Sequence, residues 1–408
     1  MRLLPPPGPA RILTLGTLVR TTGRGLWLVA SALFLTRSVG LSATQVGVGL
    51  TISALVGVLA STPSGYLADR VGPRGVQVGG LIAAGVLTAA LITVRSFPAF
   101  VLVGAATALA DAVERGGRGA LIAGAVPADQ RVHTRAYLRA TTNVGISVGA
   151  VLGGFAIAAD TRTGYLNPDP GHGGGVAGRS GDLRPAAHRR APVDAPTRGP
   201  RLVALRDRPF LAFTLLDGLM SMHFSLLTLA LPLWIAGHTT APVWMISVLT
   251  LVNTVLVVLL QVRAARAAVT LPGAARASRR AGAVIALACV LFAASGALPT
   301  PGAIGLLCVG SLAHVIGELW HSAAGWGISF GLAPADAHGQ YQGTYGMGYE
   351  LGKMLAPVVV TSLALGWGVP GWLVLAGLFL LLGALVPPVV RWAGRTRPTS
   401  RVTEPATI

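Results

Sequence analysis

The chain alternates between long apolar runs and short polar connections, and eleven of the runs are long enough to be membrane helices. An α-helix needs about 20 mostly apolar residues to cross the ~30 Å hydrocarbon core of a bilayer. Only helices and closed barrels satisfy every backbone polar group there. We expect helices at residues 12–36, 42–63, 74–94, 98–125, 134–159, 209–236, 242–268, 280–299, 302–330, 340–365 and 369–391. The pattern therefore predicts an all-α polytopic membrane protein.

The connection between the second and third runs is a charged stretch, residues 65–74, with the sequence GYLADRVGPR. Its charged side chains cannot lie in lipid, so it is predicted at a membrane face. Gly65 and Gly72 let two helix ends approach closely, and Pro73 suits the first turn of the next helix. Asp69 is suited to cap a helix N-terminus and Arg70 to pair with an acid on a neighbouring helix. The plainer interpretation is a solvated, positively charged turn.

This stretch resembles the loop between helices 2 and 3 of the major facilitator superfamily, whose pattern is G-x-L-A-D-R-x-G-x-R. Every fixed position is filled here. In that family the loop braces the inward-facing side and is released as the transporter rocks. The resemblance implies the same role for Asp69, Arg70 and Arg74, in a hinge bounded by Gly65 and Gly72. It also implies two pseudo-symmetric six-helix halves, with substrate bound between them near the middle of the membrane.

One helix of that fold is missing from the hydrophobic pattern. Residues 1–159 form an N-terminal half with five predicted helices, residues 209–392 a C-terminal half, and residues 393–408 a cytoplasmic tail. The intervening segment, 160–208, is rich in Gly, Pro and Arg. Each arginine at mid-membrane would cost about 2.5–3.5 kcal/mol on insertion scales, so segment 160–208 is not expected to be a membrane helix. It is either natural or the product of a local reading-frame slip that replaced helix 6. We favour the slip, which an unshifted frame on resequencing would contradict.

Composition and charge support a membrane protein. Of the 408 residues, 52% are hydrophobic and only 11% charged, against about 25% charged in soluble proteins. The net charge of +18 does not indicate nucleic-acid binding, because the arginines mostly lie in the connections instead of forming one basic face. Their bias towards alternate connections predicts that both termini are cytoplasmic. We expect a multi-pass protein of the plasma membrane.

Ionisable side chains inside the predicted helices concentrate on four of them, at 12–36, 98–125, 209–236 and 302–330. Such groups are costly in a membrane and mark functional sites. By the resemblance these are helices 1, 4, 7 and 10, which line the central cavity of the family. The candidates for substrate binding or proton coupling are Arg20, Arg24, Asp111, Glu114, Arg115, Arg118, Asp217, His223, His314, Glu318 and His321.

Glu318 is the first candidate for proton coupling. His314, Glu318 and His321 are spaced i, i+4, i+7, so they share one helix face. A carboxylate beside imidazoles in a poorly solvated cavity can have its proton affinity tuned into the working range. The alternative is a hydrogen-bonded polar seam between helices. No fourth ligand is evident for a metal, and we expect none.

The helix predicted at 134–159 carries a stripe of small residues, Gly145, Gly149, Gly153 and Gly154. Such a stripe permits close helix contact. It resembles the antiporter motif of the family, G-x-x-x-G-P-x-x-G-G, except that Ala150 replaces the proline. Generic packing is an equal alternative.

These observations predict a secondary active transporter, not an enzyme, that exports a small organic compound in exchange for protons. The ATP-binding pattern G-x-x-x-x-G-K-[ST] does not occur, so an ion gradient should supply the energy. We expect no cofactor, and a monomer whose partners are its substrate, protons and lipid. Two alternatives stay open: Arg20 and Arg24 could select an anionic solute for uptake, or the loss of helix 6 could leave a non-transporting remnant.

Overall fold

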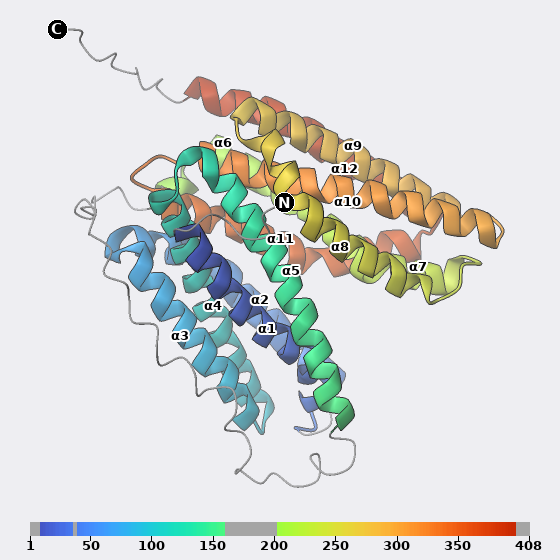
Figure 1. Cartoon of the computed structure of the whole chain (residues 1–408), viewed down its shortest axis with the longest axis horizontal. Coiled ribbons are helices and arrows are strands. Elements are labelled where there is room, and N and C mark those ends of the chain that lie inside the picture. Colours follow the sequence, from blue (N-terminus) through green and yellow to red (C-terminus); the bar gives the residue numbers. More distant parts are fainter. Residues whose placement is uncertain (1–8, 36–38, 160–201, 397–408) are drawn as a thin grey trace.

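The computed structural model describes residues 9–35, 39–159 and 202–396 (Figure 1). Within those ranges the chain is helical and contains no strand. The helices are α1 (Pro9–Leu33), α2 (Ala43–Val71), α3 (Pro73–Ala90), α4 (Phe97–Ala125), α5 (Ala128–Ala159), α6 (Arg208–Met220), α7 (Leu231–His238), α8 (Met245–Ala264), α9 (Leu271–Ser295), α10 (Thr300–Gly331), α11 (His338–Thr361) and α12 (Val369–Thr396). The predicted all-α fold is confirmed. Residues 160–201 lie outside the described part, so the interpretation of segment 160–208 stays a prediction, as does the division of the chain built around it.

Eight helical segments of the described chain are long and apolar enough to cross a membrane. They carry large apolar side chains on their outer surfaces, such as Leu102 at 73% exposure and Val86 at 64%. That arrangement suits contact with lipid. Helices α1, α5 and α11 are not among the eight, and each carries charged side chains along its length.

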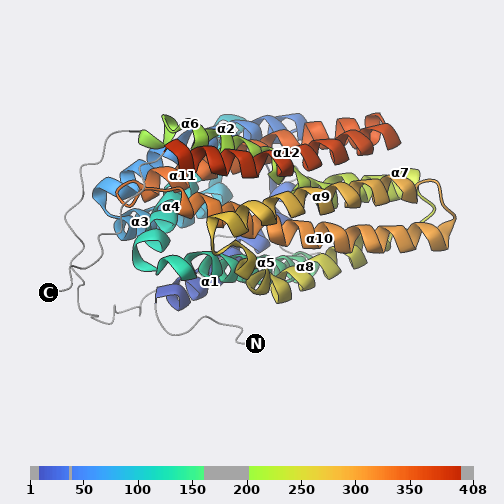
Figure 2. The ribbon, with the colours of Figure 1, turned by 90° about the horizontal axis from the view of Figure 1, so that it is seen from above.

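The helices form two sets, α1–α5 and α6–α12. In the first set α1 packs along α5, and α4 along both α2 and α3; in the second, α9 packs between α10 and α12. The sets meet chiefly where α2 and α4 lie against α11 and where α5 lies against α8. Figure 1 shows them converging near α11 and pointing apart at their other ends, and in Figure 2 the long helices run in roughly one direction.

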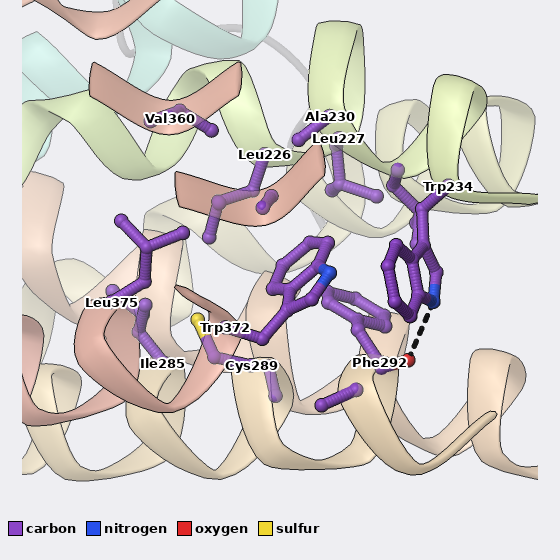
Figure 3. Packing of buried hydrophobic residues seen from close by; sticks show 14 of the residues in the cluster. Leu226, Leu227, Ala230, Trp234, Ile285, Cys289, Phe292, Val360, Trp372 and Leu375 are labelled. Atoms are coloured by element: carbon purple, nitrogen blue, oxygen red, sulfur yellow. Dashed lines mark hydrogen bonds between the residues drawn. The ribbon is translucent and has the colours of Figure 1, made fainter. Parts of the chain in front are cut away.

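A dense apolar core holds the second set together (Figure 3). Trp372 of α12 is fully buried, with its ring centroid 5.6 Å from that of Phe292 in α9. The indole Nε1 of Trp234 in α7 donates to the Phe292 carbonyl at 2.9 Å, which satisfies a polar atom inside the core.

The joint between α2 and α3 differs from the prediction. The predicted helix end at residue 63 is wrong, because α2 continues through Pro63 to Val71. Only Gly72 interrupts the helices; its φ of 110° lies in the region that glycine alone adopts readily. Pro73 opens α3, as predicted. Residues 65–71 are therefore the last turns of a helix and not a loop.

The span predicted at 209–236 is one bent, interrupted helix instead of one regular helix. It begins with Asp207, whose carboxylate caps α6 by accepting from the Phe210 amide at 3.1 Å. Between α6 and α7 lie a 3₁₀ turn, Ser221–His223, and a π turn, Leu226–Ala230. Irregular turns of this kind frequently mark functional positions.

Candidate transport site between the two sets of helices

Asp69 joins the two sets at one end of the bundle. Its Oδ1 accepts from the Gly339 amide at 2.6 Å and its Oδ2 from the Gln340 amide at 2.9 Å. These amides belong to the first turn of α11, so the carboxylate caps that helix and meets the positive end of its dipole. We call this the Asp69 end of the molecule.

Two glycines let α2 and α11 come this close. A Cβ added at Gly65 would lie 2.6 Å from the carbonyl carbon of Gly339, and one added at Gly343 would lie 3.1 Å from the Cα of Thr62. Nearby, the hydroxyls of Thr62 and Thr344 are hydrogen bonded at 3.2 Å.

The arginines of the charged stretch lie elsewhere. Arg70 is exposed, and its guanidinium lies 5.5 Å from the ring centroid of Tyr66 on its own helix. Arg74 is exposed at the start of α3. Among the described residues neither forms an ion pair with an acid, so the pairing expected for Arg70 is not present in this conformation.

The ionisable groups of α4 pair in two directions. Glu114, which is buried, lies 3.4 Å from Arg118 one turn further along α4. Arg115 faces the other set, with its Nη2 4.0 Å from Glu350 Oε1 of α11. Glu350 also lies 3.4 Å from Lys353, as its spacing predicts.

Arg20 and Arg24 lie on α1 near this cluster. The charged groups acting on Arg20 are Arg118, Glu114, Arg24 and Asp111. Arg20 and Asp111 are half-buried and Arg24 is exposed. Three arginines, Arg20, Arg24 and Arg118, thus lie with two acids, Glu114 and Asp111, so this group carries one excess positive charge.

The largest group of buried ionisable side chains lies between α6 and α10. Asp217, His223, His314, Glu318 and His321 are each at most 5% exposed. His223 follows α6 in the 3₁₀ turn, whereas the last three share one face of α10. The five candidates that the sequence supplied from these two spans thus occupy one cluster.

The three imidazoles form a chain. His314 Nε2 lies 3.2 Å from His223 Nδ1, and His223 Nε2 lies 3.0 Å from His321 Nδ1. His321 Nε2 then lies 3.2 Å from Asp217 Oδ1. At the other end His314 Nδ1 is 3.8 Å from Glu318 Oε2. No group of three ligating side chains in the described part of the chain has the geometry to hold a metal ion.

Glu318 connects the two sets of helices. Its Oε1 accepts from Arg139 Nη2 of α5 at 2.5 Å, and its Oε2 accepts from Asn253 Nδ2 of α8 at 3.0 Å. Arg139 also donates to Ser322 of α10 at 2.8 Å and lies over the Phe224 ring at 4.8 Å. Three further groups, Asn253, Ser322 and Phe224, therefore converge on one carboxylate–guanidinium pair.

The sequence did not identify Arg139 as a site residue. It served there only as one of the arginines whose distribution predicts the orientation of the protein in the membrane. Its neighbour Arg135, one turn earlier on α5, donates to Gln342 of α11 at 3.1 Å. The available signal was their i, i+4 spacing, which puts both guanidinium groups on one face of a helix.

The small-residue stripe of α5 faces α1. A Cβ added at Gly145 would lie 3.0 Å from that of Thr21, and one added at Gly149 would lie 2.8 Å from the carbonyl carbon of Thr22. Gly153 and Gly154 belong to the last turns of α5, and their surroundings lie outside the described residues.

Solved structures share this arrangement of helices. The human organic anion transporter MFSD10 (TETRAN) is 18% identical, with a TM-score of 0.63 over 93% of this chain and 100% of that one. A bacterial homologue of the iron transporter ferroportin, solved in the outward-facing state with soaked iron, is 14% identical, with a TM-score of 0.66 over 96% of this chain and 100% of that one. A variant of the E. coli fucose:proton symporter FucP is 11% identical, with a TM-score of 0.64 over 94% of this chain and 98% of that one. At these identities the likeness concerns the fold.

A search of curated proteins returns no match. The family model for the Major Facilitator Superfamily matches residues 13–260, which is more than half of the chain and includes the charged stretch at 65–74. Because that match agrees with the helix arrangement and with the solved transporters, the chain belongs to the major facilitator superfamily of membrane transporters and is not an enzyme.

Proposed function

We propose that this transporter exports a small organic compound in exchange for protons, and that Glu318 is the carboxylate whose protonation releases the closed state. The observation that carries the proposal is the bond of 2.5 Å between Glu318 and Arg139. It joins α10 to α5, so it exists only while the two sets of helices are together at this level.

Protonation changes this contact directly. An ionised Glu318 accepts from both Arg139 and Asn253. A neutral carboxyl loses the ionic part of the bond to Arg139, and hydrogen bonds to charged groups contribute about 1.5–3 kcal/mol. Arg139 keeps its bond to Ser322, so the guanidinium is not left without a partner. One proton would thus shift the balance between closed and open forms by about 10- to 150-fold.

The same release involves the Asp69 end. Asp69 and Arg135 also hold the two sets together, through Gly339 and Gln342. In the proposed cycle these contacts break together with the Glu318–Arg139 pair, because all of them connect elements that move apart as rigid bodies. The arginine bias supports a cytoplasmic position for the Asp69 end, in what the proposal takes to be the plasma membrane.

The distance between the two sets at the Asp69 end tests the proposal. Spin labels at Val71 (69% exposed) and Val269 (40% exposed) report it by double electron–electron resonance in lipid nanodiscs, with Cys289 and Cys308 replaced by alanine. We expect a longer distance to gain population as pH falls. Glu318→Gln, which resembles the protonated form, should show that distance at every pH.

Glu114→Gln is the matched control. Glu114 is a buried acid paired with an arginine, but its partner Arg118 lies on the same helix. Its loss should leave the pH dependence of the distance unchanged. A Glu318→Gln protein whose distance still titrates like that of the wild type would contradict the proposal.

Uptake of an organic anion is the second candidate. It is supported by the excess positive charge around Arg20 and Arg24, and the similar human structure is an organic anion transporter. Proteoliposomes filled with the pH-sensitive dye pyranine distinguish export by antiport from uptake by symport. The organic cation ethidium and the organic anion naphthalenesulfonate are added outside as test substrates. Antiport makes the lumen alkaline as a probe enters, whereas symport makes it acidic. Absence of both signals with every probe would favour the non-transporting remnant.

A further inference from the structure

The histidine chain has a direction that a single backbone atom determines. His314 Nε2 lies 3.0 Å from the carbonyl oxygen of His223, as well as 3.2 Å from His223 Nδ1. A carbonyl oxygen can only accept a hydrogen bond, so the proton of neutral His314 is on Nε2. That carbonyl is the last in the 3₁₀ turn Ser221–His223, where the span is irregular.

The tautomers of the other two imidazoles follow from the first. His223 Nδ1 faces the N–H of His314, so it accepts, and the proton of His223 is on Nε2. That Nε2 is 3.0 Å from His321 Nδ1, which therefore accepts in turn. The proton of His321 is then on Nε2, 3.2 Å from Asp217 Oδ1. The N–H groups of His314 and His223 point from Glu318 towards Asp217. The last step is a close approach and not a hydrogen bond, because His321 Nε2 lies 3.2 Å from Asp217 Oδ1 but has no hydrogen-bond partner among the described residues.

The nitrogen at the start of the chain is left bare. His314 Nδ1 is buried without a hydrogen-bond partner among the described residues, and Glu318 Oε2 is the acid nearest to it, at 3.8 Å. A protonated Glu318 can supply the proton that this nitrogen lacks. At the far end, the Tyr345 hydroxyl is hydrogen bonded to Asp217.

We propose that His314, His223 and His321 relay a proton between Glu318 and Asp217, which makes Asp217 a second proton site of the transporter. This inference rests on the proposed role of Glu318. The proton leaves Glu318 for His314 Nδ1, the Nε2 proton of His314 passes to His223 Nδ1, that of His223 passes to His321 Nδ1, and that of His321 passes to Asp217. One carboxyl becomes a carboxylate, the other carboxylate becomes a carboxyl, and each imidazole exchanges an Nε2–H for an Nδ1–H.

The relay carries one proton and then needs resetting. After transfer, His314 presents a bare Nε2 to the His223 carbonyl, so two lone pairs face each other. This state is disfavoured, and the proton returns to Glu318 unless Asp217 passes it on. The surrounding groups that face the relay are Arg139 on Glu318, Asn253 on Glu318, and Tyr345 on Asp217.

Infrared spectroscopy of the full-length protein in lipid vesicles tests the relay with protons as the only probe. Difference spectra after a rapid drop in pH follow the carboxyl bands, which Glu318→Gln and Asp217→Asn assign. Asp217 is 4% exposed and Glu318 5%, so burial does not distinguish direct protonation of Asp217 from transfer through the histidines, and a variant within the chain is needed. We expect His223→Gln, whose amide bonds but cannot relay, to slow protonation of Asp217 by about 100-fold or more, since positioned acid–base groups contribute about 10²–10⁴-fold.

His238→Gln is the matched control, because His238 lies at the end of α7, stacked on Trp234 and outside the chain of imidazoles. It should leave the rate unchanged. An Asp217 band that rises equally fast in His223→Gln and in the wild type, or never rises at all, overturns the relay. The pH-dependent distance between the labels at Val71 and Val269 would survive that result, so failure of the relay is distinguishable from failure of the proposed function.

Imidazole nitrogen chemical shifts from solid-state NMR supply a measurement that needs no variant. Above the titration range all three histidines should be Nε2–H tautomers. An Nδ1–H tautomer at His314 would overturn the assigned direction, even if the histidine variants failed to fold.

Discussion

Replacing Asp69 by asparagine should weaken the closure at the Asp69 end without unfolding the protein. The carboxylate accepts from two amides of α11, at 2.6 and 2.9 Å. Asparagine has nearly the same shape but only one acceptor, and its NH₂ group would face the second amide. The substitution therefore removes one charge-assisted bond, makes the other neutral, and removes a negative charge from a helix N-terminus.

The magnitude follows from these contacts. A hydrogen bond to a charged group contributes about 1.5–3 kcal/mol and a neutral one about 0.5–1.5 kcal/mol. A charge at a helix end adds roughly 0.3–1 kcal/mol. We estimate that Asp69→Asn shifts the closed–open equilibrium by about 3–5 kcal/mol, which is ~150- to 5,000-fold in population.

Alkylation of a buried thiol measures that shift over a wide range. Thr62 is 2% exposed between α2 and α11, so a Thr62→Cys thiol reacts with N-ethylmaleimide only when the sets separate. With Cys289 and Cys308 replaced by alanine, Asp69→Asn should raise the reaction rate in membranes by the factor above. Asp129→Asn, at an exposed acid in the first turn of α5, should not. Equal rates for Asp69→Asn and its parent would refute the reasoning.

Two further predictions concern stability, and a third concerns the closure between the two sets of helices. Trp372→Ala should lower the free energy of unfolding by about 3–5 kcal/mol, because it empties a fully buried site; chemical denaturation in detergent measures this. Gly149→Ala should cost about 1–3 kcal/mol, since its Cβ would press on the backbone of Thr22, whereas Gly79→Ala, with open space around it, should cost nothing in the same assay. Glu350→Gln should raise the alkylation rate at Thr62→Cys less than Asp69→Asn does, because its contact with Arg115 is a looser 4.0 Å.

The helices were predictable because lipid permits few other structures. Their ends were less so. Pro63 suggested a helix end, but membrane helices tolerate proline, and α2 continues to Val71. The spacing of His314, Glu318 and His321 was sufficient to put them on one face. The partners of that face were not predictable, since Arg139 is 179 positions from Glu318 and His223 is 98 from His321. No local pattern encodes contacts over such separations.

The single residue between α2 and α3 has a mechanical consequence. Gly72 turns the chain at a φ of 110°, and helix resumes at once with Pro73. A link this short has no slack, so α2 and α3 act as one stiff elbow. Any displacement that moves the C-terminal end of α2 away from α11 must therefore move α3 as well. A flexible insertion at Gly72 would let α2 move while α3 stays in place, and the first set of helices would no longer move as one rigid body.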